Sequence, residues 1–342
     1  MRYDEYSHLG GKRVLHHVMD NKGLLLIPEG TVLTEHHIEL MANFKVDVFD
    51  VIVQEVETGP ANQAEVRELV NKTAARLQDI DHFVQANGTV PVLELEEKVL
   101  PVIMEAARKR NLFQLFADLK SMADYRYKQS IGVVVMSAML GKWLHLDQKE
   151  LSLLNSAASL YDIGSVKLPS YLLKKPERLL PSEREIMKEH AMLGYELLLE
   201  SGVDPRIARV ALQHHEREDG SGYPQGIKGS EIDPLSKIIA LADVYVAMTS
   251  ARPYREAYAF YEVIHEIHKQ IIQGRFDSAI GLTFLNGLMA AQIGSEVILS
   301  DERKGRILLI NPNYPTSPLV SLDDEFIDLS KDGSVKIKEI VG

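Results

Sequence analysis

Histidine and aspartate side chains that could hold a metal ion recur along the middle of the chain. They are Asp162 in AASLYDIGSVKLP, His190 in MKEHAMLGYELL, the adjacent pair His214 and His215 in ALQHHEREDGSGYP, and Asp243 in IALADVYVAM. Imidazole nitrogens and carboxylate oxygens are ligands that iron, manganese, zinc and nickel accept in proteins. Because several helices can direct such side chains into one bundle core, the pattern favours a sulfur-free metal site.

Each histidine taken alone is more typical of an ordinary, partly buried residue with one hydrogen bond. We leave six others in that ordinary class: His16, His17, His36, His37, His265 and His268. The adjacent pair differs because a sharply turned loop follows it, and that loop contains Asp219, Gly220, Gly222, Tyr223 and Pro224. Loops built this way often carry function. Glycine and proline are equally typical of a simple helix end, so both interpretations stay open.

The composition limits the chemistry further. The chain has 342 residues, with 38 Lys and Arg against 49 Asp and Glu, for a formal net charge of -11. Such a chain has no overall basic field, so we expect no DNA binding, and any polyanion must bind locally. The absence of cysteine excludes disulfides, cysteine-ligated zinc and iron–sulfur clusters, and it favours a reducing compartment.

The hydrophobic patterns predict a mainly α chain with a small module at each end. Helical periodicity prevails through the middle, while short β-type runs occupy both ends, with a helix expected from Thr34 to Phe44 and a strand-type run from Val46 to Gln54,. A polar segment from Glu55 to Asn62 predicts a linker,. The expected parts are a small α+β module (1–58), a helical connector (59–120), a helical bundle domain (121–291) and a β-rich extension (292–342).

Two apolar helical stretches bear on membranes and on self-association. The run from Ile131 to Gly141 is about half as long as the roughly 20 residues that a bilayer span needs, so a core helix is expected. The first residues lack the features of a signal peptide, which favours a cytoplasmic protein,. The amphipathic stretch from Tyr261 to Ile272 is typical of core packing, although it could also pair with a second copy in a homodimer.

The motifs around the histidines carry a family resemblance. HHEREDGSGYP, with PLSKIIALADVYVAMTSARPYREA after it and DIGSVKLPSYLLKKPERL and MKEHAMLGYELL before it, resembles the HD-GYP family of cyclic di-GMP phosphodiesterases. The resemblance extends from about Tyr125 to Leu288, about half the chain, in the family's order and spacing. It implies an HD-type helical bundle with a two- or three-metal centre, often iron or manganese, where a metal-bridging water attacks the phosphodiester.

The resemblance also assigns roles position by position. His190, His214 and His215 match three ligands of one metal, Asp162 matches the bridging aspartate, and Asp243 matches the aspartate that completes the other metal. Two basic residues, Arg252 and Arg255, match positions that hold the phosphates of the dinucleotide,. The loop Gly222-Tyr223-Pro224 matches the segment linked to substrate placement and, in some members, to contacts with diguanylate cyclases.

Four positions depart from the family pattern. Tyr161 replaces the histidine of the HD dyad, and Gln129 replaces an earlier histidine of the same metal. A phenol and an amide are poor substitutes for two imidazoles. Ser165 stands where the family has the lysine of DIGK, which removes a cation expected near the scissile phosphate, and Val246 replaces a second aspartate.

These departures lead to three hypotheses. The first is a divergent HD-GYP domain that binds cyclic di-GMP and holds one iron or manganese ion, with hydrolysis absent or impaired. Retention of Arg252 and Arg255 beside the loss of the lysine at Ser165 favours this binding role. The second is an active phosphodiesterase that uses the retained three-histidine half of the site. The third is a helical scaffold for the N-terminal module, although residues 1–60 contain no catalytic motif,.

Overall fold

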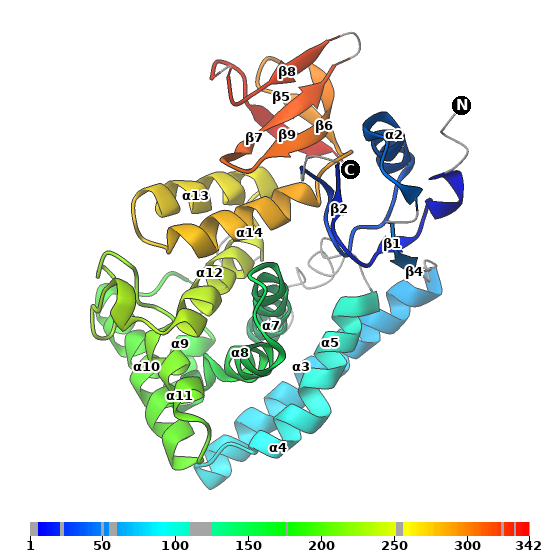
Figure 1. Ribbon diagram of the computed structural model, residues 1–342. Coiled ribbons are helices and arrows are strands. Elements are labelled where there is room, and N and C mark those ends of the chain that lie inside the picture. The colour runs from blue at the N-terminus through cyan, green and yellow to red at the C-terminus, as the bar shows by residue number, and fades with distance from the viewer. Residues whose placement is uncertain are drawn as a thin grey trace. The chain divides into compact units, whose positions relative to one another are not determined.

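The computed structural model describes residues 6–20, 24–48, 51–54, 60–109, 125–175, 177–250, 256–322, 325–331 and 333–341. The chain divides into two compact units. The mixed unit comprises Met1–Gly59, Ala259–His268 and Leu282–Gly342, and the helical unit comprises Pro60–Tyr258 and Lys269–Gly281. The expected class, a mainly α chain with a small β-rich C-terminal part, is confirmed (Figure 1).

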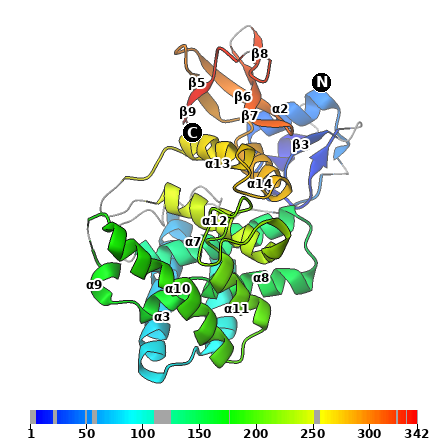
Figure 2. The same cartoon turned by 90° about the vertical axis from the view of Figure 1, so that its left-hand side faces the viewer.

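The helical unit is a bundle assembled from successive helices of the middle of the chain (Figures 1 and 2). Their bounds are α3 Pro60–Asn87, α4 Val92–Glu94, the π-helical turn η3 Leu95–Val99, α5 Leu100–Lys109, α7 Tyr125–Trp143, α8 Gln148–Leu160, η4 Ile163–Lys167, α9 Ser170–Leu173, α10 Pro181–Glu200, α11 Pro205–Gln213, η5 Gly229–Glu231 and α12 Pro234–Thr249. Helices α13, Phe260–Ile272, and α14, Ser278–Ala290, each have residues in both units.

Local sequence explains where several of these helices begin and end. The carboxylates of Asp204 and Asp233 accept hydrogen bonds from backbone N–H groups in the first turns of α11 and α12. Each is followed by a proline in the first helical turn, where the missing N–H costs nothing,. Helix α3 ends before Gly88, whose φ of +72° suits glycine,. Helix α3 begins at Pro60, so the last residues of the predicted linker are helical.

Helix α7 forms the core of the helical unit. Its residues from Ile131 to Met136 are almost all fully buried, as expected for a core helix. Among the described residues, the structure contains no helix with the length and apolarity needed to cross a bilayer. The apolar stripe of α13 is also buried within the chain, through Val263, Ile264 and Ile267.

One close approach of backbones brings the site segments together. Helix α10 packs against both α11 and η4. Gly164 in η4 lies so near α10 that a Cβ atom there would overlap the backbone of His190 and Gly194. A residue without a side chain is therefore required where the segment after Asp162 crosses the helix that carries His190.

The mixed unit contains two small sheets, one helix and a larger antiparallel sheet. Its N-terminal elements are η1 Ser7–Leu9, β1 Arg13–Val14, β2 Val18–Met19, β3 Leu25–Ile27, α2 Glu35–Phe44 and β4 Val53–Gln54, with β1 paired to β4 and β2 to β3. Its C-terminal strands are β5 Glu296–Leu299, β6 Lys304–Asn311, β7 Tyr314–Ser321, β8 Phe326–Asp328 and β9 Ile337–Val341, in the order β8-β7-β6-β5-β9.

The N-terminal module departs from the sequence expectation at one strand. Among the described residues of the predicted run from Val46 to Gln54, the paired strand is limited to Val53–Gln54. Lys45 adopts φ 53°, and the backbone N–H of Val46 donates to the carbonyl of Met41. Val46 therefore completes the end of α2 and is unavailable to start a strand.

Candidate metal centre

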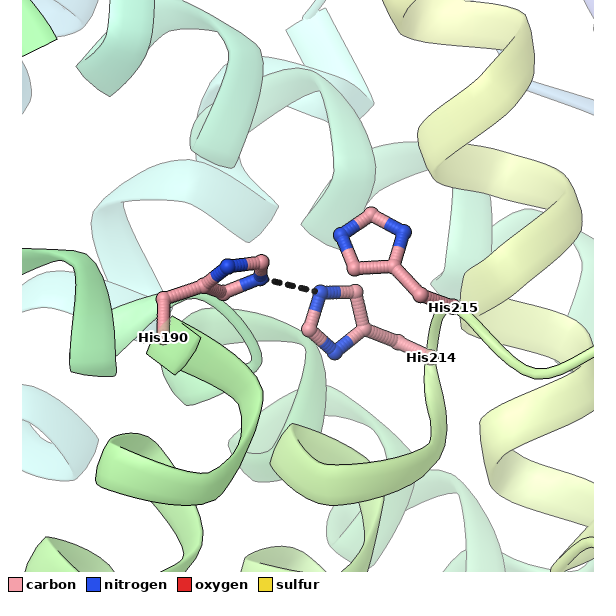
Figure 3. Close-up of side chains that lie close together, drawn as sticks. All are labelled: His190, His214 and His215. Atoms are coloured by element: carbon pink, nitrogen blue, oxygen red, sulfur yellow. Dashed lines mark hydrogen bonds between the residues drawn. The ribbon is translucent and has the colours of Figure 1, made fainter. Parts of the chain in front are cut away.

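Three histidines from two helix segments converge in the helical unit (Figure 3). His190 lies on α10, His214 caps the C-terminus of α11, and His215 follows in the turn. Taking one ring nitrogen from each, these candidate ligand atoms all lie within 4.8 Å of one another. The structure therefore brings together the three imidazoles that the sequence pattern singled out.

The hydrogen bonds of the Nδ1 atoms show which ring nitrogens of His190 and His214 are left to face the centre. Nδ1 of His190 lies 2.5 Å from the carbonyl oxygen of Met187, and Nδ1 of His214 lies 2.9 Å from that of Ala211. A carbonyl can only accept, so we infer that both Nδ1 atoms carry the proton. In the neutral rings, both Nε2 atoms then present bare lone pairs, yet they face each other at 3.2 Å.

Two lone pairs at this distance fit a shared cation. Metal–nitrogen bonds of about 2.0–2.1 Å place two imidazole nitrogens of one metal about 3.0–3.4 Å apart. The observed 3.2 Å lies inside that range, and Oδ1 of Asp162 lies 3.5 Å from the same Nε2 of His190. Three imidazoles and an adjacent carboxylate are also a donor set suited to iron or manganese. The residues present therefore fit the metal that the resemblance implies.

Burial favours the neutral state of His214 and His215. His190 and His214 are 4% and 1% exposed. Burial, followed by the neighbouring His190, holds the pKa of His214 well below its usual value. Burial likewise lowers the pKa of His215, with His214 as the next cause. Neutral imidazoles are the form that binds metals.

Asp243 has a different environment, because protein donors already hold it. Its Oδ1 accepts hydrogen bonds from Nε2 of Gln129 at 2.8 Å and from the hydroxyl of Tyr161 at 2.9 Å. Burial, then the nearby Asp243 and Asp162, raises the pKa of Tyr161 well above its usual value, so the phenol stays protonated and donates. Asp243 and Asp162 lie outside the group of three histidines in the described part of the chain.

The loop after the histidines folds back onto them. The ring of Tyr223 stacks on His215, with centroids 4.5 Å apart and planes 26° apart. Gly222 is packed so closely that a Cβ would overlap the backbone of Glu216 and His215. A simple helix end requires none of these contacts, so the loop forms one wall of the centre.

Glu216 is a site residue that the sequence analysis did not single out. Its side chain is 2% exposed, and its Oε1 accepts the backbone N–H groups of Gln225 and Gly226 at 2.7 and 3.1 Å. The carboxylate thus fastens the loop just beyond Pro224. In the sequence, its position directly after His214 and His215 could have indicated a role in the site.

Arg126 is a second such residue, and it contacts Ser165. The sequence places Ser165 where the family has the lysine of DIGK, which removes a cation expected near the scissile phosphate. In the structure, Nη1 of Arg126, from the first turn of α7, donates to Oγ of Ser165 at 2.7 Å. A guanidinium from another helix therefore occupies the neighbourhood of Ser165. In the sequence, the place of Arg126 three residues before Gln129, in the segment YRYKQS, could have indicated a role in the site.

The outcomes for three other predicted positions are simpler. Val246 is fully buried within α12, where it contributes to the apolar core. Arg252 and Arg255, predicted to hold phosphates, lie outside the described residues.

Comparison with known proteins defines the family. The profile of the HD domain family matches residues 106–280, just over half of the chain. A cyclic di-GMP phosphodiesterase response regulator of Xanthomonas campestris pv. campestris is 40% identical over 139 residues, covering 40% of this chain and 36% of that protein. A cyclic di-GMP phosphodiesterase of Pseudomonas aeruginosa is 28% identical over 260 residues, covering 73% and 62%.

A solved structure supports the same fold. An HDG"Y"P protein from Bdellovibrio bacteriovorus aligns with a TM-score of 0.50 and 17% identity, covering 82% of this chain and 96% of that one. The chain belongs to the HD domain family, and the expected likeness to HD-GYP phosphodiesterases is confirmed. It spans less than two thirds of the length of the two curated relatives described above.

Proposed function

We propose that this chain is a divergent HD-GYP domain that binds a cyclic dinucleotide, with cyclic di-GMP the first candidate, and holds one iron or manganese ion. Phosphodiester hydrolysis is absent or strongly impaired. The observation that carries the proposal is the contrast between the two halves of the site. Three imidazoles converge in one half, whereas Gln129 and Tyr161 hold the aspartate of the other half through hydrogen bonds.

His190, His214, His215 and Asp162 are the residues that would hold the ion. The bound metal would supply Lewis acidity and neutralise charge on the phosphate oxygens. Around it, the backbone carbonyls of Met187 and Ala211 fix the orientation of two imidazoles,. Tyr223 covers His215 from one face.

The impairment of hydrolysis follows from the state of Asp243. A carboxylate oxygen that accepts two short hydrogen bonds is a weakened ligand, and neither an amide nor a protonated phenol replaces the lost imidazoles,. Both donors must leave Asp243 before a second metal can use this oxygen. Without a second ion, the stabilisation of charge in the transition state is incomplete.

An active phosphodiesterase is the second candidate, and the position of Arg126 favours it. Its guanidinium places a cation beside Ser165, in a pocket that Asp162 also lines. A single-metal site assisted by this cation could retain slow turnover. The predicted docking of a diguanylate cyclase on the GYP loop, Asp219 to Pro224, and the predicted homodimer remain predictions.

Anaerobic loading with Fe(II) or Mn(II), followed by calorimetric titration with cyclic di-GMP and analysis of the linear product, tests the proposal. We expect binding, with hydrolysis at least about a hundredfold below that of an intact HD-GYP enzyme assayed in parallel. His214→Ala serves as the metal-site control and should lose the ion. Efficient turnover that disappears in His214→Ala would establish the second candidate, and absence of nucleotide binding would contradict both.

A further inference from the structure

A small pocket with both polar and apolar lining residues lies in the helical unit beside the candidate metal centre. Residues from α3, η3, α7, α8 and η4 line it, and they include Asp81, Arg126, Tyr127, Asp162 and Ser165. Asp162 also lies 3.5 Å from Nε2 of His190, so one carboxylate belongs to both the pocket and the surroundings of the histidine cluster. A molecule in this pocket would be next to the proposed ion.

Arg126 is held in this pocket by two separate elements. Its Nη2 pairs with Oδ2 of Asp81 on α3, and the hydroxyl of Tyr127 donates to the same oxygen at 2.9 Å. Its Nη1 reaches the other way and donates to Oγ of Ser165 at 2.7 Å. The guanidinium is therefore fixed in orientation, while 24% of the Arg126 side chain stays exposed.

A simple ion pair between α3 and α7 does not account for this arrangement. Such a pair uses only the Nη2 edge that faces Asp81. The Nη1 edge instead donates to Ser165 in η4, three residues beyond Asp162, so the guanidinium also reaches the segment that carries this carboxylate. The short side chain of Ser165 is compatible with a guanidinium at this place, where a long lysine would compete for the same space.

We propose that Arg126 binds a phosphate oxygen of the cyclic dinucleotide and that Asp81 positions it. This inference rests on the proposed function. A planar guanidinium with N–H donors on several edges suits a phosphate, and a preoriented one loses less entropy on binding. The short-range positive charge that the family obtains from a lysine would thus come from a different helix in this chain.

Titration of the metal-loaded full chain with cyclic di-GMP tests this role. We expect Arg126→Ala to weaken binding about 10- to 100-fold, as for loss of a charged hydrogen bond, with metal content unchanged. Adding Ser165→Lys to Arg126→Ala should recover part of the affinity, because it returns a cation to the same neighbourhood.

A matched pair of variants distinguishes the effect of the Arg126 charge on nucleotide affinity from the effect of the contact between α3 and α7. Asp81→Asn keeps the guanidinium, whereas Asp81→Asn with Arg126→Gln removes both charges and leaves no unpaired carboxylate between the helices. Equal affinity of these two variants, at equal metal content, would overturn the proposal for Arg126. Failure of the unaltered chain to bind any cyclic dinucleotide would instead overturn the proposed function.

Discussion

Asp243 is held by two hydrogen bonds from neighbouring side chains. Gln129 and Tyr161 both donate to the same carboxylate oxygen, and burial keeps the phenol protonated. On the function that we propose, each of these side chains supplies a proton where an imidazole of the family would supply a lone pair. The hydrogen bonds then take the place of a second metal ion at Asp243.

Restoring both imidazoles should reverse this change. In Gln129→His with Tyr161→His, Asp243 loses its two donors and gains two potential co-ligands. We expect the metal content to rise from about one ion per chain to about two. Plasma emission spectrometry on anaerobically loaded protein measures it, with each single variant as control. A double variant that still binds one ion would show that hydrogen bonding to Asp243 is not what excludes the second.

At the scale of elements, the centre depends on the close approach of η4 and α10. Gly164 makes that approach possible, and it joins the segment after Asp162 to the helix that carries His190. The packing of α10 against α11 then brings the Nε2 atoms of His190 and His214 to 3.2 Å from each other. Gly164 has no side chain of its own, yet it determines how closely the segments that carry Asp162 and His190 approach each other.

Gly164→Ala should therefore damage both stability and metal binding. A Cβ here overlaps the backbone of α10, so η4 must move, at a cost of about 1–3 kcal/mol,. Thermal unfolding and metal titration measure the two effects. Gly333→Ala is the matched control, because a Cβ there meets nothing within 4 Å. A Gly164→Ala protein with unchanged melting and unchanged metal affinity would contradict this packing argument.

Helix α2 in the mixed unit carries a separate, pH-dependent contribution to stability. His37 is 3% exposed, and burial, followed by the neighbouring His36, lowers its pKa to about 4. The unfolded chain, with a histidine pKa of about 6.5, takes up the proton first. Stability from this residue is therefore complete above pH 6.5 and is lost as pH falls toward 4.

We expect α2 to lose about 2–3 kcal/mol of protection between pH 7 and pH 4. Hydrogen exchange of peptides from α2, corrected for intrinsic rates, measures this. His37→Asn is the control: its amide oxygen can replace Nδ1 as acceptor for the backbone N–H of Thr34, and it does not titrate. An equally steep pH dependence in His37→Asn would assign the effect to another group, such as His36.

At the scale of the whole molecule, metal binding should stabilise one unit and leave the other unchanged. All candidate ligands belong to the helical unit. A ligand that binds only the folded state adds stability that grows with the logarithm of its concentration relative to Kd, about 3–4 kcal/mol when that concentration is a hundred to a thousand times Kd. Chelation should therefore increase hydrogen exchange in α10 and α11 and leave β5 to β9 unaffected. Equal loss of protection in both units would contradict this localisation.

Sequence patterns predicted much of this molecule where the signal is local. The helix at Glu35–Phe44 has a side-chain cap at Thr34, and the C-terminal strands follow alternating runs separated by turns. The three histidines were found because their motifs lie in a recognisable order. The roles of Arg126 and Asp81 could not be read in this way, since their contact joins residues 45 positions apart and depends on how α3 packs against α7.

The most direct test of the central claim is a count of metal ions and of turnover on the same anaerobically loaded sample. The account predicts about one iron or manganese per chain, bound cyclic di-GMP and little linear product. His214→Ala should lose the ion. Two ions per chain with rapid hydrolysis would contradict the account, because the hydrogen bonds from Gln129 and Tyr161 would then not keep Asp243 from serving a second metal.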